Sequence, residues 1–412
     1  MALPEPRVTA TLRIDQASDM CWDVVVIGAG PAGAMAAREA ARGGAMVLLV
    51  DRASFPRPKV CGCCINGAAI GVLTEVGLGD LLEQNHAQAL HAVRLASAGR
   101  FANIRLSEGV SLSRERFDTA LIQAAINEGV EFLDETQAMI GSAEAETRGV
   151  EAEKRDVVLK RGTAEQVTGA KVIVVAGGLG CRVFVDGESD ERQASPSSRV
   201  GAGTVLDAAP AAYTAGTIYM ACHEHGYVGL VRLEDDRLDI AAALDADAIK
   251  QFGGIATLVE RILTSAKLPI PEALNTASWH GTGRLTQHRE HVVGERCFFI
   301  GDAAGYVEPF TGEGMAWALA SGRAVVPIVL QFLQDENHLN AMLSWHVTHK
   351  ELIAHRARLC RDVSRLLRYP TIVSIAVRLL AYAPWLAWPV VRSLNSSFDK
   401  NPFYNATTRN QR

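Results

Sequence analysis

The 412-residue sequence lacks the features that mark several classes of protein. It has no excess of basic residues: 41 Lys and Arg stand against 46 Asp and Glu, which argues against a nucleic-acid partner. Its eight cysteines are scattered apart from Cys61, Cys63 and Cys64, so no disulfide framework is predicted. Residues 1–20 contain no apolar run of signal-peptide length, and we interpret them as a flexible lead-in to a cytoplasmic protein.

Long apolar runs are equally scarce. Residues 371–391 are mostly apolar, but Arg378 lies within them and Pro384 and Pro389 interrupt them. Such a segment is a poor candidate for a spanning helix. What the sequence does have is a hydrophobic fraction of 48%, and its length suffices for two or three closely packed units.

The N-terminal region has the pattern of a βαβ unit. A β-branched run at residues 23–27 ends in glycines and is followed by a helix-forming stretch at 34–42. A second apolar run at 46–50 then stops at Asp51. This order predicts two parallel strands joined by a helix, with a carboxylate at the tip of the second strand.

The rest of the chain mixes both periodicities. Its expected elements are a helix at 111–129, hairpin strands at 138–169, a buried strand at 171–178, strands of a second, mainly antiparallel sheet within 195–255, a buried strand at 297–300, a helix at 313–333, and helices from 335 to about 392.

The turn after the first strand carries a dinucleotide fingerprint, Gly28-Ala29-Gly30-Pro31-Ala32-Gly33. Gly28 makes the turn, Gly30 clears space for a pyrophosphate, and Gly33 permits close packing of the helix, whose N-terminus faces the phosphate charge. Asp51, followed by Arg52, stands where a carboxylate accepts the ribose hydroxyls, which favours NAD or FAD over NADP at this site.

A second glycine-rich turn lies far along the chain and favours FAD. The strand ending at Ile300 delivers Gly301 and Asp302, and the turn Gly312-Glu313-Gly314 opens a helix at Met315. The positive end of that helix suits the negative charge of a reduced flavin. The alternative is an ordinary strand, turn and helix with a capping acid. We prefer a cofactor site, because two such turns suit one long cofactor.

With these motifs in place, residues 22–333 resemble the flavoprotein superfamily of geranylgeranyl reductases and p-hydroxybenzoate-hydroxylase-type monooxygenases. The resemblance implies that FAD contacts the three fingerprint glycines, Asp51, Asp302, and Arg114 ahead of Phe117 and Asp118. Gly305, Glu313 and the loop containing Lys59 and Cys61 are similar to the geranylgeranyl reductase branch.

The sequence also departs from its relatives. Gly177 and Gly178 stand where hydroxylases usually have Asp-Gly, which argues against a hydroxylase-like docking of NAD(P)H. The Trp-x-Trp-x-Ile-Pro signature of flavin halogenases is absent. Residues 225–230 lack the tryptophan and proline of the reductase branch's substrate motif.

The expected fold is therefore α/β: a Rossmann-like FAD-binding domain with an inserted, mainly antiparallel substrate-domain sheet and a helical C-terminal region. After the lead-in at 1–20, we assign the parts as 21–66, 112–182 and 285–335 for the FAD-binding domain, 67–111 and 183–284 for the substrate domain, and 336–412 for the C-terminal region.

Cys61, Cys63 and Cys64 allow three interpretations. A metal site would need further ligands, and no Cys-x-x-Cys partner exists elsewhere, so no metal is expected. The thiols are either small packed side chains, or Cys61 is a catalytic proton donor or polar contact beside the flavin. Lys59 is either part of the loop beside the flavin or a solvated surface charge.

Two further groups carry open alternatives. His223, Glu224 and His225 precede a strand, and a surface loop is preferred over an active-site position. Later, Arg358, Arg361, Arg365 and Arg368 follow one helical face ahead of a Trp- and Leu-rich stretch. This pattern fits peripheral contact with a membrane, but a helical cap on the FAD domain is preferred.

The sequence thus predicts an FAD-dependent oxidoreductase that takes electrons from NAD(P)H or another donor and acts on a hydrophobic small molecule, isoprenoid- or polyketide-like. Ene-reduction is preferred to hydroxylation by a monooxygenase. A flavin-binding protein used only in electron transfer is the third alternative. The oligomeric state is left open.

Overall fold

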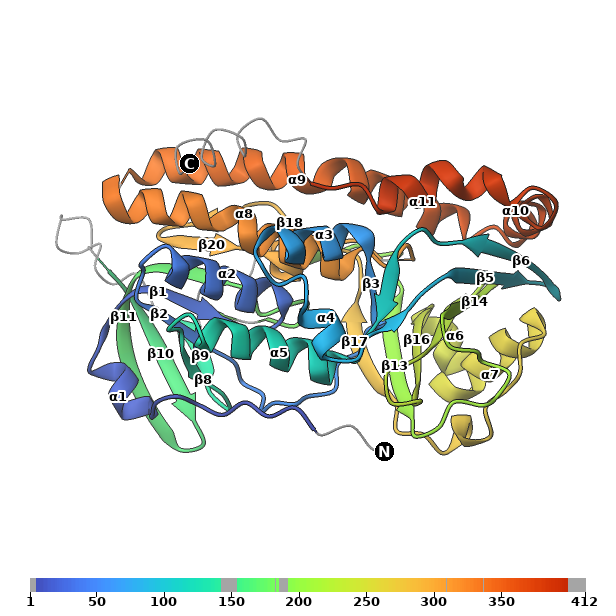
Figure 1. Cartoon of the computed structure of the whole chain (residues 1–412), viewed down its shortest axis with the longest axis horizontal. Coiled ribbons are helices and arrows are strands. Elements are labelled where there is room, and N and C mark those ends of the chain that lie inside the picture. Colours follow the sequence, from blue (N-terminus) through green and yellow to red (C-terminus); the bar gives the residue numbers. More distant parts are fainter. Residues whose placement is uncertain are drawn as a thin grey trace.

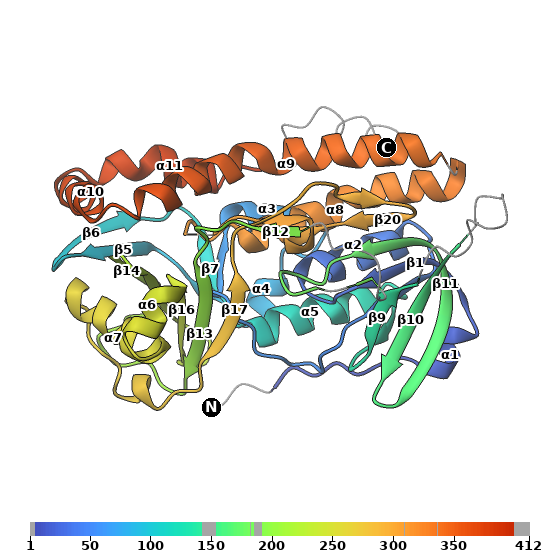
Figure 2. The same ribbon diagram turned by 180° about the vertical axis from the view of Figure 1, so that it is seen from behind.

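The computed structural model describes residues 5–141, 154–181, 183–184, 192–308, 310–335 and 337–398. In this part of the chain two large sheets lie side by side, and helices from the last quarter of the sequence run along both (Figure 1). The reverse view shows the same arrangement (Figure 2). The expected α/β fold, with a second sheet and a helical C-terminal region, is confirmed.

The first sheet is built on the N-terminal βαβ unit. Strand β1 (Cys21–Ile27) pairs in parallel with β2 (Val47–Val50) on one side and β11 (Ala164–Val175) on the other. The apolar side chains of these strands are almost wholly buried, as in a sheet covered on both faces. The sheet is completed by β8 (Glu131–Leu133), β9 (Gln137–Ile140), β10 (Arg155–Arg161), β19 (Val293–Gly294) and β20 (Cys297–Phe299).

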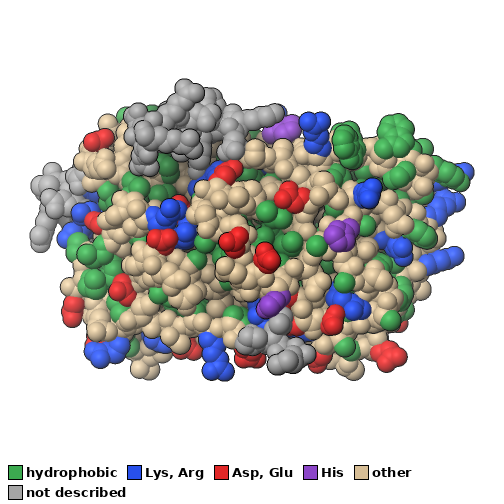
Figure 3. Space-filling view, in the orientation of Figure 1, with side chains coloured by type: hydrophobic (Ala, Val, Ile, Leu, Met, Phe, Trp, Pro, Cys, Tyr) green, Lys and Arg blue, Asp and Glu red, His purple; other side chains and the backbone are tan. Residues whose placement is uncertain are grey.

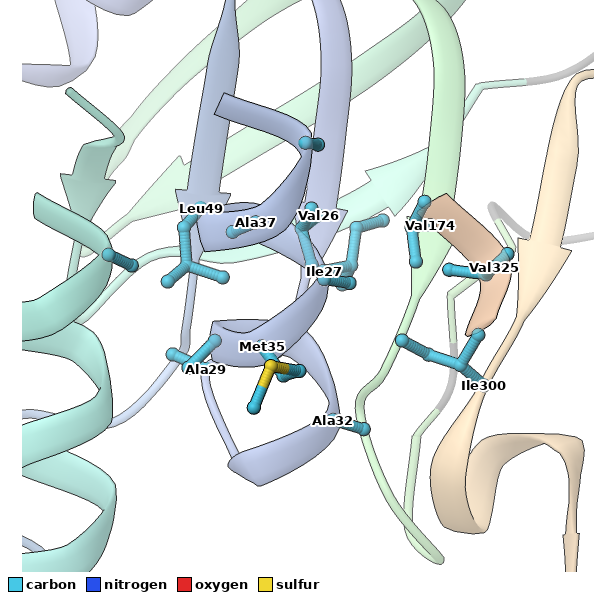
Figure 4. Packing of buried hydrophobic residues seen from close by; sticks show 14 of the residues in the cluster. Val26, Ile27, Ala29, Ala32, Met35, Ala37, Leu49, Val174, Ile300 and Val325 are labelled. Carbon is cyan, nitrogen blue, oxygen red and sulfur yellow. The ribbon is translucent and has the colours of Figure 1, made fainter. Parts of the chain in front are cut away.

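Helix α2 (Pro31–Arg42) packs against helix α8 (Gly314–Asp335). Alanines of α2 let Met35 pack between the strands and α8 (Figure 4). A Cβ added at Gly322 of α8 would lie 2.3 Å from the backbone oxygen of Ala32, so the contact admits no larger residue. Among the described residues, α8 is the one unbroken helix long and apolar enough to cross a bilayer, but 72% of that stretch is buried, as in a core helix.

The residues expected to form a flexible lead-in are partly structured. Residues Ile14–Ser18 form helix α1, and Ala17 is fully buried. The backbone oxygen of Ala17 accepts hydrogen bonds from the Trp22 indole and the Thr168 hydroxyl, which tie α1 to the first sheet. The expectation of a loose segment is therefore wrong for this helix, because strands β1 and β11 supply partners that the local composition does not reveal. Residues 1–4 lie outside the described part.

Helix α5 covers the same sheet and begins later than expected. It spans Arg114–Ile126, because the hydroxyl of Ser113 accepts a hydrogen bond from the backbone N–H of Arg116 and caps the helix. Ser111, the expected start, instead ends strand β7 (Gly109–Ser111). The first charged side chain of the helix is therefore Arg114, at its N-terminus.

The second sheet runs in the order β17-β13-β16-β15-β14-β5-β6. All its pairs are antiparallel except β14 with β5, which agrees with a mainly antiparallel substrate sheet. Its strands are β5 (Ala92–Ser97), β6 (Arg100–Arg105), β13 (Val200–Leu206), β14 (Thr217–His223), β15 (Gly226–Arg232), β16 (Leu238–Leu244) and β17 (His280–Arg284). Helix α7 (Ile255–Ala266) packs on one face, preceded by α6 (Ala246–Gln251) and followed by η2 (Glu272–Asn275).

Helix α3 differs from the expected division of the chain. It spans Gly67–Glu75, within the stretch assigned to the substrate domain, but Val72 and Leu73 pack in the core of the first sheet beside α8. Only β5 and β6 of residues 67–111 join the second sheet. Short elements complete the connection: α4 (Leu81–Gln84), β3 (Cys64–Asn66), β4 (Gln88–Ala89), β12 (Arg192–Ala194), β18 (Gln287–Arg289), η3 (Gly301–Ala304) and β21 (Gly305–Tyr306).

The C-terminal region consists of helices α9 (His338–Leu366), α10 (Pro370–Tyr382), η4 (Pro384–Ala387) and α11 (Trp388–Leu394). The fully buried Trp345 anchors α9, since its indole donates a hydrogen bond to the backbone oxygen of Phe299. Helix α10 packs on β6 of the second sheet. Residues 399–412, expected to be irregular, lie outside the described part.

Candidate functional site

A cavity of about 980 Å³ lies between the two sheets, a size typical of small-molecule sites. Both glycine-rich turns open into it, as do strands of the second sheet and helix α11. Its wall includes most of the cofactor-binding residues predicted from the sequence: Gly28, Gly30, Pro31, Ala32, Asp51, Arg52, Lys59, Arg114, Asp302, Gly312, Gly314 and Met315, together with the candidate catalytic residue Cys61.

The fingerprint turn has the geometry that its glycines require. Gly28 has a φ of +106°, and a Cβ there would lie 2.6 Å from the backbone oxygen of Ala176. A Cβ at Gly33 would lie 1.8 Å from the backbone oxygen of Gly28, so this glycine sits beneath the turn rather than in the cavity wall. Gly30, by contrast, faces the cavity, where the nearest atoms are side-chain nitrogens of Arg57 and Arg114. These positions match a turn that brings its backbone against a pyrophosphate.

Asp51 lies at the end of β2 beside this turn. One carboxylate oxygen accepts a hydrogen bond of 2.7 Å from the backbone N–H of Ala29, and the other accepts one of 2.9 Å from Ala53. These bonds fix the carboxylate at the cavity wall, and each oxygen keeps a further lone pair. A ribose hydroxyl could therefore donate to it.

The second turn meets the first. Gly301 has a φ of +56°, and a Cβ there would lie 2.9 Å from the Cβ of Ala32 at the start of α2. The backbone N–H of Gly301 donates to the hydroxyl of Ser321 on α8. The N-terminal residues of both α2 and α8 thus line one cavity, and the positive ends of their helix dipoles favour an anionic ligand there.

Charged side chains are concentrated where the turns converge. Arg114 forms a bidentate pair with Asp118, with both N–O distances 2.8 Å, and Asp118 is fully buried. Enclosure by protein lowers the pKa of Lys59, and the nearby Arg114 and Arg57 lower it further. Burial raises the pKa of Asp302, which Lys59 and Arg114 oppose.

Arg57 is a site residue that the sequence reasoning missed. It lines the cavity, and its guanidinium lies 3.8 Å from the Asp51 carboxylate and 3.6 Å from that of Asp118. The available signal was its place two residues before Lys59, in the loop that the family resemblance singled out. Arg57 adds a second guanidinium to the end of the cavity that holds the fingerprint.

Cys61 and Cys63 both line the cavity, and their thiols are joined by a hydrogen bond. The hydrogen bond from Cys63, with help from Arg114, lowers the pKa of Cys61 to about 5 against the opposing effect of burial. The same hydrogen bond, together with burial, raises the pKa of Cys63. Cys64 differs: burial raises its pKa, and its thiol donates to the backbone oxygen of Gly62. Cys61 therefore favours a thiolate while Cys63 keeps its proton.

A smaller cavity of about 240 Å³ lies next to this pair and is also lined by Asp239 on β16. Asp239 is 4% exposed, and its Oδ2 has no hydrogen-bond partner in the described part of the chain. Burial, and to a smaller extent the charge of Cys61, raise the pKa of Asp239 well above its usual value. A hydrogen bond from Cys63 lowers it. Cys63 and Asp239, whose pKa values are raised, thus lie beside Cys61, an arrangement that the sequence did not indicate.

The far end of the large cavity is apolar. Tyr227 and Phe310 meet there edge to face, with ring centroids 5.0 Å apart. Further apolar side chains of the wall come from the second sheet and from the C-terminal helices: Leu95, Ile104, Ile218, Met220, Leu285, Val390, Val391 and Leu394. The cavity therefore joins a charged end to an apolar end.

Two groups singled out from the sequence do not line the cavity, and for the second group this agrees with the preferred surface position. The Glu313 carboxylate is fully buried and turned toward α9, where the Arg356 guanidinium donates to it at 2.5 Å. His223 ends β14, Glu224 and His225 form the turn to β15, and none of the three is part of the cavity wall. Their potential ligand atoms lie within 4.8 Å of one another, but Arg199 donates to the backbone oxygen of Glu224 and the positive charge of Arg261 acts on His223. Such a setting disfavours a bound cation.

Comparisons with known proteins agree with this geometry. Residues 21–344 match the family model described as an FAD binding domain. The chain is 26% identical to a menaquinone reductase of Mycolicibacterium smegmatis, over 89% of this chain and 94% of the relative. It is 28% identical to a geranylgeranyl diphosphate reductase of Rhodobacter capsulatus, over 77% of each. The solved structure of the flavin-dependent brominase Bmp2 aligns with a TM-score of 0.69 at 17% identity, covering 91% of this chain and 94% of the brominase, which shows the shared fold.

Proposed function

The chain belongs to the FAD-binding-domain family and is an FAD-dependent oxidoreductase, and from this premise we propose that it saturates a carbon–carbon double bond in a polyprenyl substrate. The observation that carries the proposal is the single cavity that joins the charged end at Gly30 and Asp51 to the apolar end at Tyr227 and Val390. An extended hydrocarbon chain fits such an apolar end. The sequence relatives named above are reductases, and one is named for a polyprenyl diphosphate.

The residues present fit FAD. Backbone at Gly30 and the N-terminus of α2 would hold the pyrophosphate, Asp51 the ribose, and Arg57, Arg114 and Lys59 would supply positive charge. When bound, FAD supplies the hydride, which it takes in turn from NAD(P)H as donor. The protein's part is then to position the double bond, exclude water and supply a proton.

We assign the delivery of the proton to the thiol pair, Cys61 and Cys63. Saturating a double bond adds one hydride and one proton, and both carbons of the double bond become tetrahedral C–H centres. Cys61 borders the cavity, but its lowered pKa favours the thiolate, so on its own it is a poor acid at neutral pH. The hydrogen bond with Cys61, followed by burial, raises the pKa of Cys63, and burial raises the pKa of Asp239. We therefore assign Cys61 as the last member of a relay that Cys63 and Asp239 refill.

The test is an anaerobic turnover experiment with the flavin-loaded protein, NAD(P)H and geranylgeranyl diphosphate or an unsaturated menaquinone. The expected product carries two more hydrogen atoms per reduced double bond, detected by mass spectrometry, without oxygen. A product that forms only in air and contains an added oxygen atom would establish a monooxygenase instead. Flavin that is reduced but never reoxidised by any polyprenyl substrate would leave electron transfer as the function.

Two variants examine the relay. Cys61→Ala should lower turnover by about 10²-fold while flavin content is unchanged, whereas Cys21→Ala, at an exposed position on β1, should match the wild type. Asp239→Asn should lower turnover less and change its pH profile, because an amide cannot pass on a proton. Equal turnover of wild type and Cys61→Ala across pH would remove the relay but leave the reductase assignment intact.

A further inference from the structure

Helix α10 has apolar side chains on its outer side as well as on the side that faces the second sheet. Val373 and Val377 face inward and are buried against the second sheet. On the opposite side, Ile372, Ile375 and Leu379 are 44%, 54% and 55% exposed. A helix on the surface of a water-soluble domain normally has a polar outer face, and an apolar one indicates a missing apolar partner.

The same exposure continues past the end of α10. Trp385 and Trp388 are 70% and 65% exposed, and Tyr382 is 83% exposed. We call this region the apolar C-terminal surface, formed by Tyr369, Ile372, Ile375, Leu379, Tyr382, Trp385, Leu386, Trp388 and Val390. Large hydrophobic side chains gather over this end of the molecule at the upper right of Figure 3. Tryptophan and tyrosine are the side chains that favour the boundary between lipid and water.

Within residues 363–398 every charged side chain is an arginine, of which Arg368 pairs with Asp245 of another segment. The sequence has no Asp or Glu between Asp362 and Asp399, but it has Arg365, Arg368, Arg378 and Arg392. Arg378 and Arg392 are exposed on α10 and α11, among the apolar residues. Arginines beside exposed aromatic and aliphatic side chains suit anionic lipid headgroups.

The shape of the segment suits a surface rather than a span. Helix α10 has 13 residues, about 20 Å, less than the ~30 Å hydrocarbon core of a bilayer. The axis turns by 119° between α10 and the following helical segment. A short apolar helix followed by a sharp bend is able to lie along an interface, with its outer face among the acyl chains.

The inner side of the same segment is part of the active cavity. Ala387, Val390, Val391 and Leu394 line the apolar end of the cavity. Helices η4 and α11 therefore line the cavity on one side and form part of the apolar C-terminal surface on the other. A hydrocarbon chain leaving a bilayer at this surface would enter the cavity without crossing water.

From these observations we propose that the apolar C-terminal surface docks on a bilayer containing anionic lipids, and that the lipophilic substrate enters the cavity from the bilayer past α11. The route for substrate rests on the proposed function, whereas the docking does not. A second copy of the chain is a poorer occupant, because a two-fold contact through this surface would bring Arg378 and Arg392 of one copy near the same arginines of the other.

The experiment is co-sedimentation of the flavin-loaded protein with vesicles of phosphatidylcholine alone or mixed with phosphatidylglycerol. Binding should be stronger to the anionic vesicles and should weaken as salt is added. Trp385→Ser with Trp388→Ser should lower binding about tenfold or more, and Arg378→Gln with Arg392→Gln should remove the preference for phosphatidylglycerol. The matched control is Val167→Ser, a 50% exposed apolar position on β11, whose hairpin lies at the opposite end of the molecule (Figure 1).

Failure of this inference is distinguishable from failure of the proposed function. Protein that stays in the supernatant with every vesicle overturns the docking, as does an equal loss in Val167→Ser. A dimer in solution that the tryptophan variants dissociate assigns the surface to a second copy. In a parallel assay with a short, water-soluble prenyl diphosphate, the tryptophan variants should keep wild-type turnover, since that substrate needs no bilayer. A lack of turnover there, with vesicle binding intact, counts against the reductase and not against the docking.

Discussion

The two ends of the cavity differ in what makes them. At the charged end, backbone turns and ion pairs form the wall: Gly28, Gly30, Asp51 and the pair of Arg114 with Asp118. At the apolar end, the wall consists of side chains from several strands and from α11. A turn that carries a pyrophosphate tolerates few residues, while an apolar wall accepts many of similar volume. Under the proposed function, we therefore expect the chemistry of the charged end to tolerate little change, and we expect the apolar end to set the substrate preference.

The largest effect should come from Gly33→Val, which places a side chain beneath the fingerprint turn at the charged end of the cavity. The new Cβ would fall 1.8 Å from the backbone oxygen of Gly28, and neither backbone segment can move away without opening the core. We expect loss of soluble, folded protein, measured by expression and circular dichroism. Gly71→Ala in α3 is the control, since nothing lies within 4 Å of its added Cβ. A folded, flavin-bearing Gly33→Val protein would show that the turn is not where we place it.

Arg114→Ala should come next, because it leaves the fully buried Asp118 carboxylate without its bidentate partner. Breaking a buried pair costs roughly 3–5 kcal/mol, which urea unfolding of the flavin-free protein would measure. Arg114→Ala with Asp118→Asn should recover part of this loss but not flavin binding. Full stability in the single variant would mean that Arg57 alone compensates Asp118.

Gly30→Val separates folding from cofactor binding at the same end. Gly30 has a φ of −73°, and its added Cβ would meet only the arginine side-chain nitrogens at 3.8 and 4.0 Å. The thermal stability of the flavin-free protein should therefore stay unchanged. The side chain would occupy space needed by the pyrophosphate, so FAD affinity should fall about ten- to a hundredfold in a fluorescence titration. Unchanged affinity would contradict the proposed cofactor position.

Ile218→Ala addresses the apolar end. Ile218 lies on β14 and lines the cavity away from the fingerprint. Removing its methyl and methylene groups should raise KM for a long polyprenyl substrate about tenfold, with FAD affinity and flavin spectrum unchanged. An FAD affinity that falls as much as KM rises would contradict the assignment of the cofactor to the charged end and of the substrate to the apolar end.

The smallest effect concerns Cys61, between the ends. Because its pKa is lowered to about 5, the thiolate is present above that pH, and alkylation of flavin-free protein by iodoacetamide should rise between about pH 4 and 6. Cys63→Ala removes the main stabilising hydrogen bond and should shift this rise to higher pH. Peptide mass spectrometry measures labelling at Cys61. Identical profiles in both proteins would remove Cys63 from the relay.

How much the sequence predicted follows from the same contrast. Gly28, Gly30, Gly33 and Asp51 were predictable, because a turn against a phosphate needs glycines at fixed spacing after a strand. The meeting of Gly301 with Ala32 was also expected, since both turns suit one cofactor. Strands β1, β2 and β20 of the first sheet were predicted for a related reason: their apolar runs are short and bounded by turn residues. The short strands β8 and β19 were not predicted.

What the sequence did not predict depends on packing between distant segments. Asp239 reaches the thiol pair only because β16 lies beside the loop of Cys61. Glu313 follows a family motif, yet its carboxylate pairs with Arg356, a residue of another helix. Helix α1 was missed for the same reason. The packing of α3 against the first sheet, rather than in the substrate domain, was missed for this reason too. No local pattern records such partners.

The family match ends at residue 344, but α11 lies beyond it and still lines the large cavity. The segment beyond the family match therefore supplies part of the apolar end of the cavity. A chimera that keeps residues up to 344 and takes its tail from a relative should retain the two glycine-rich turns, but its new tail must replace the contacts of Trp345 with Phe299 and of Arg356 with Glu313, and it changes the apolar wall of the cavity.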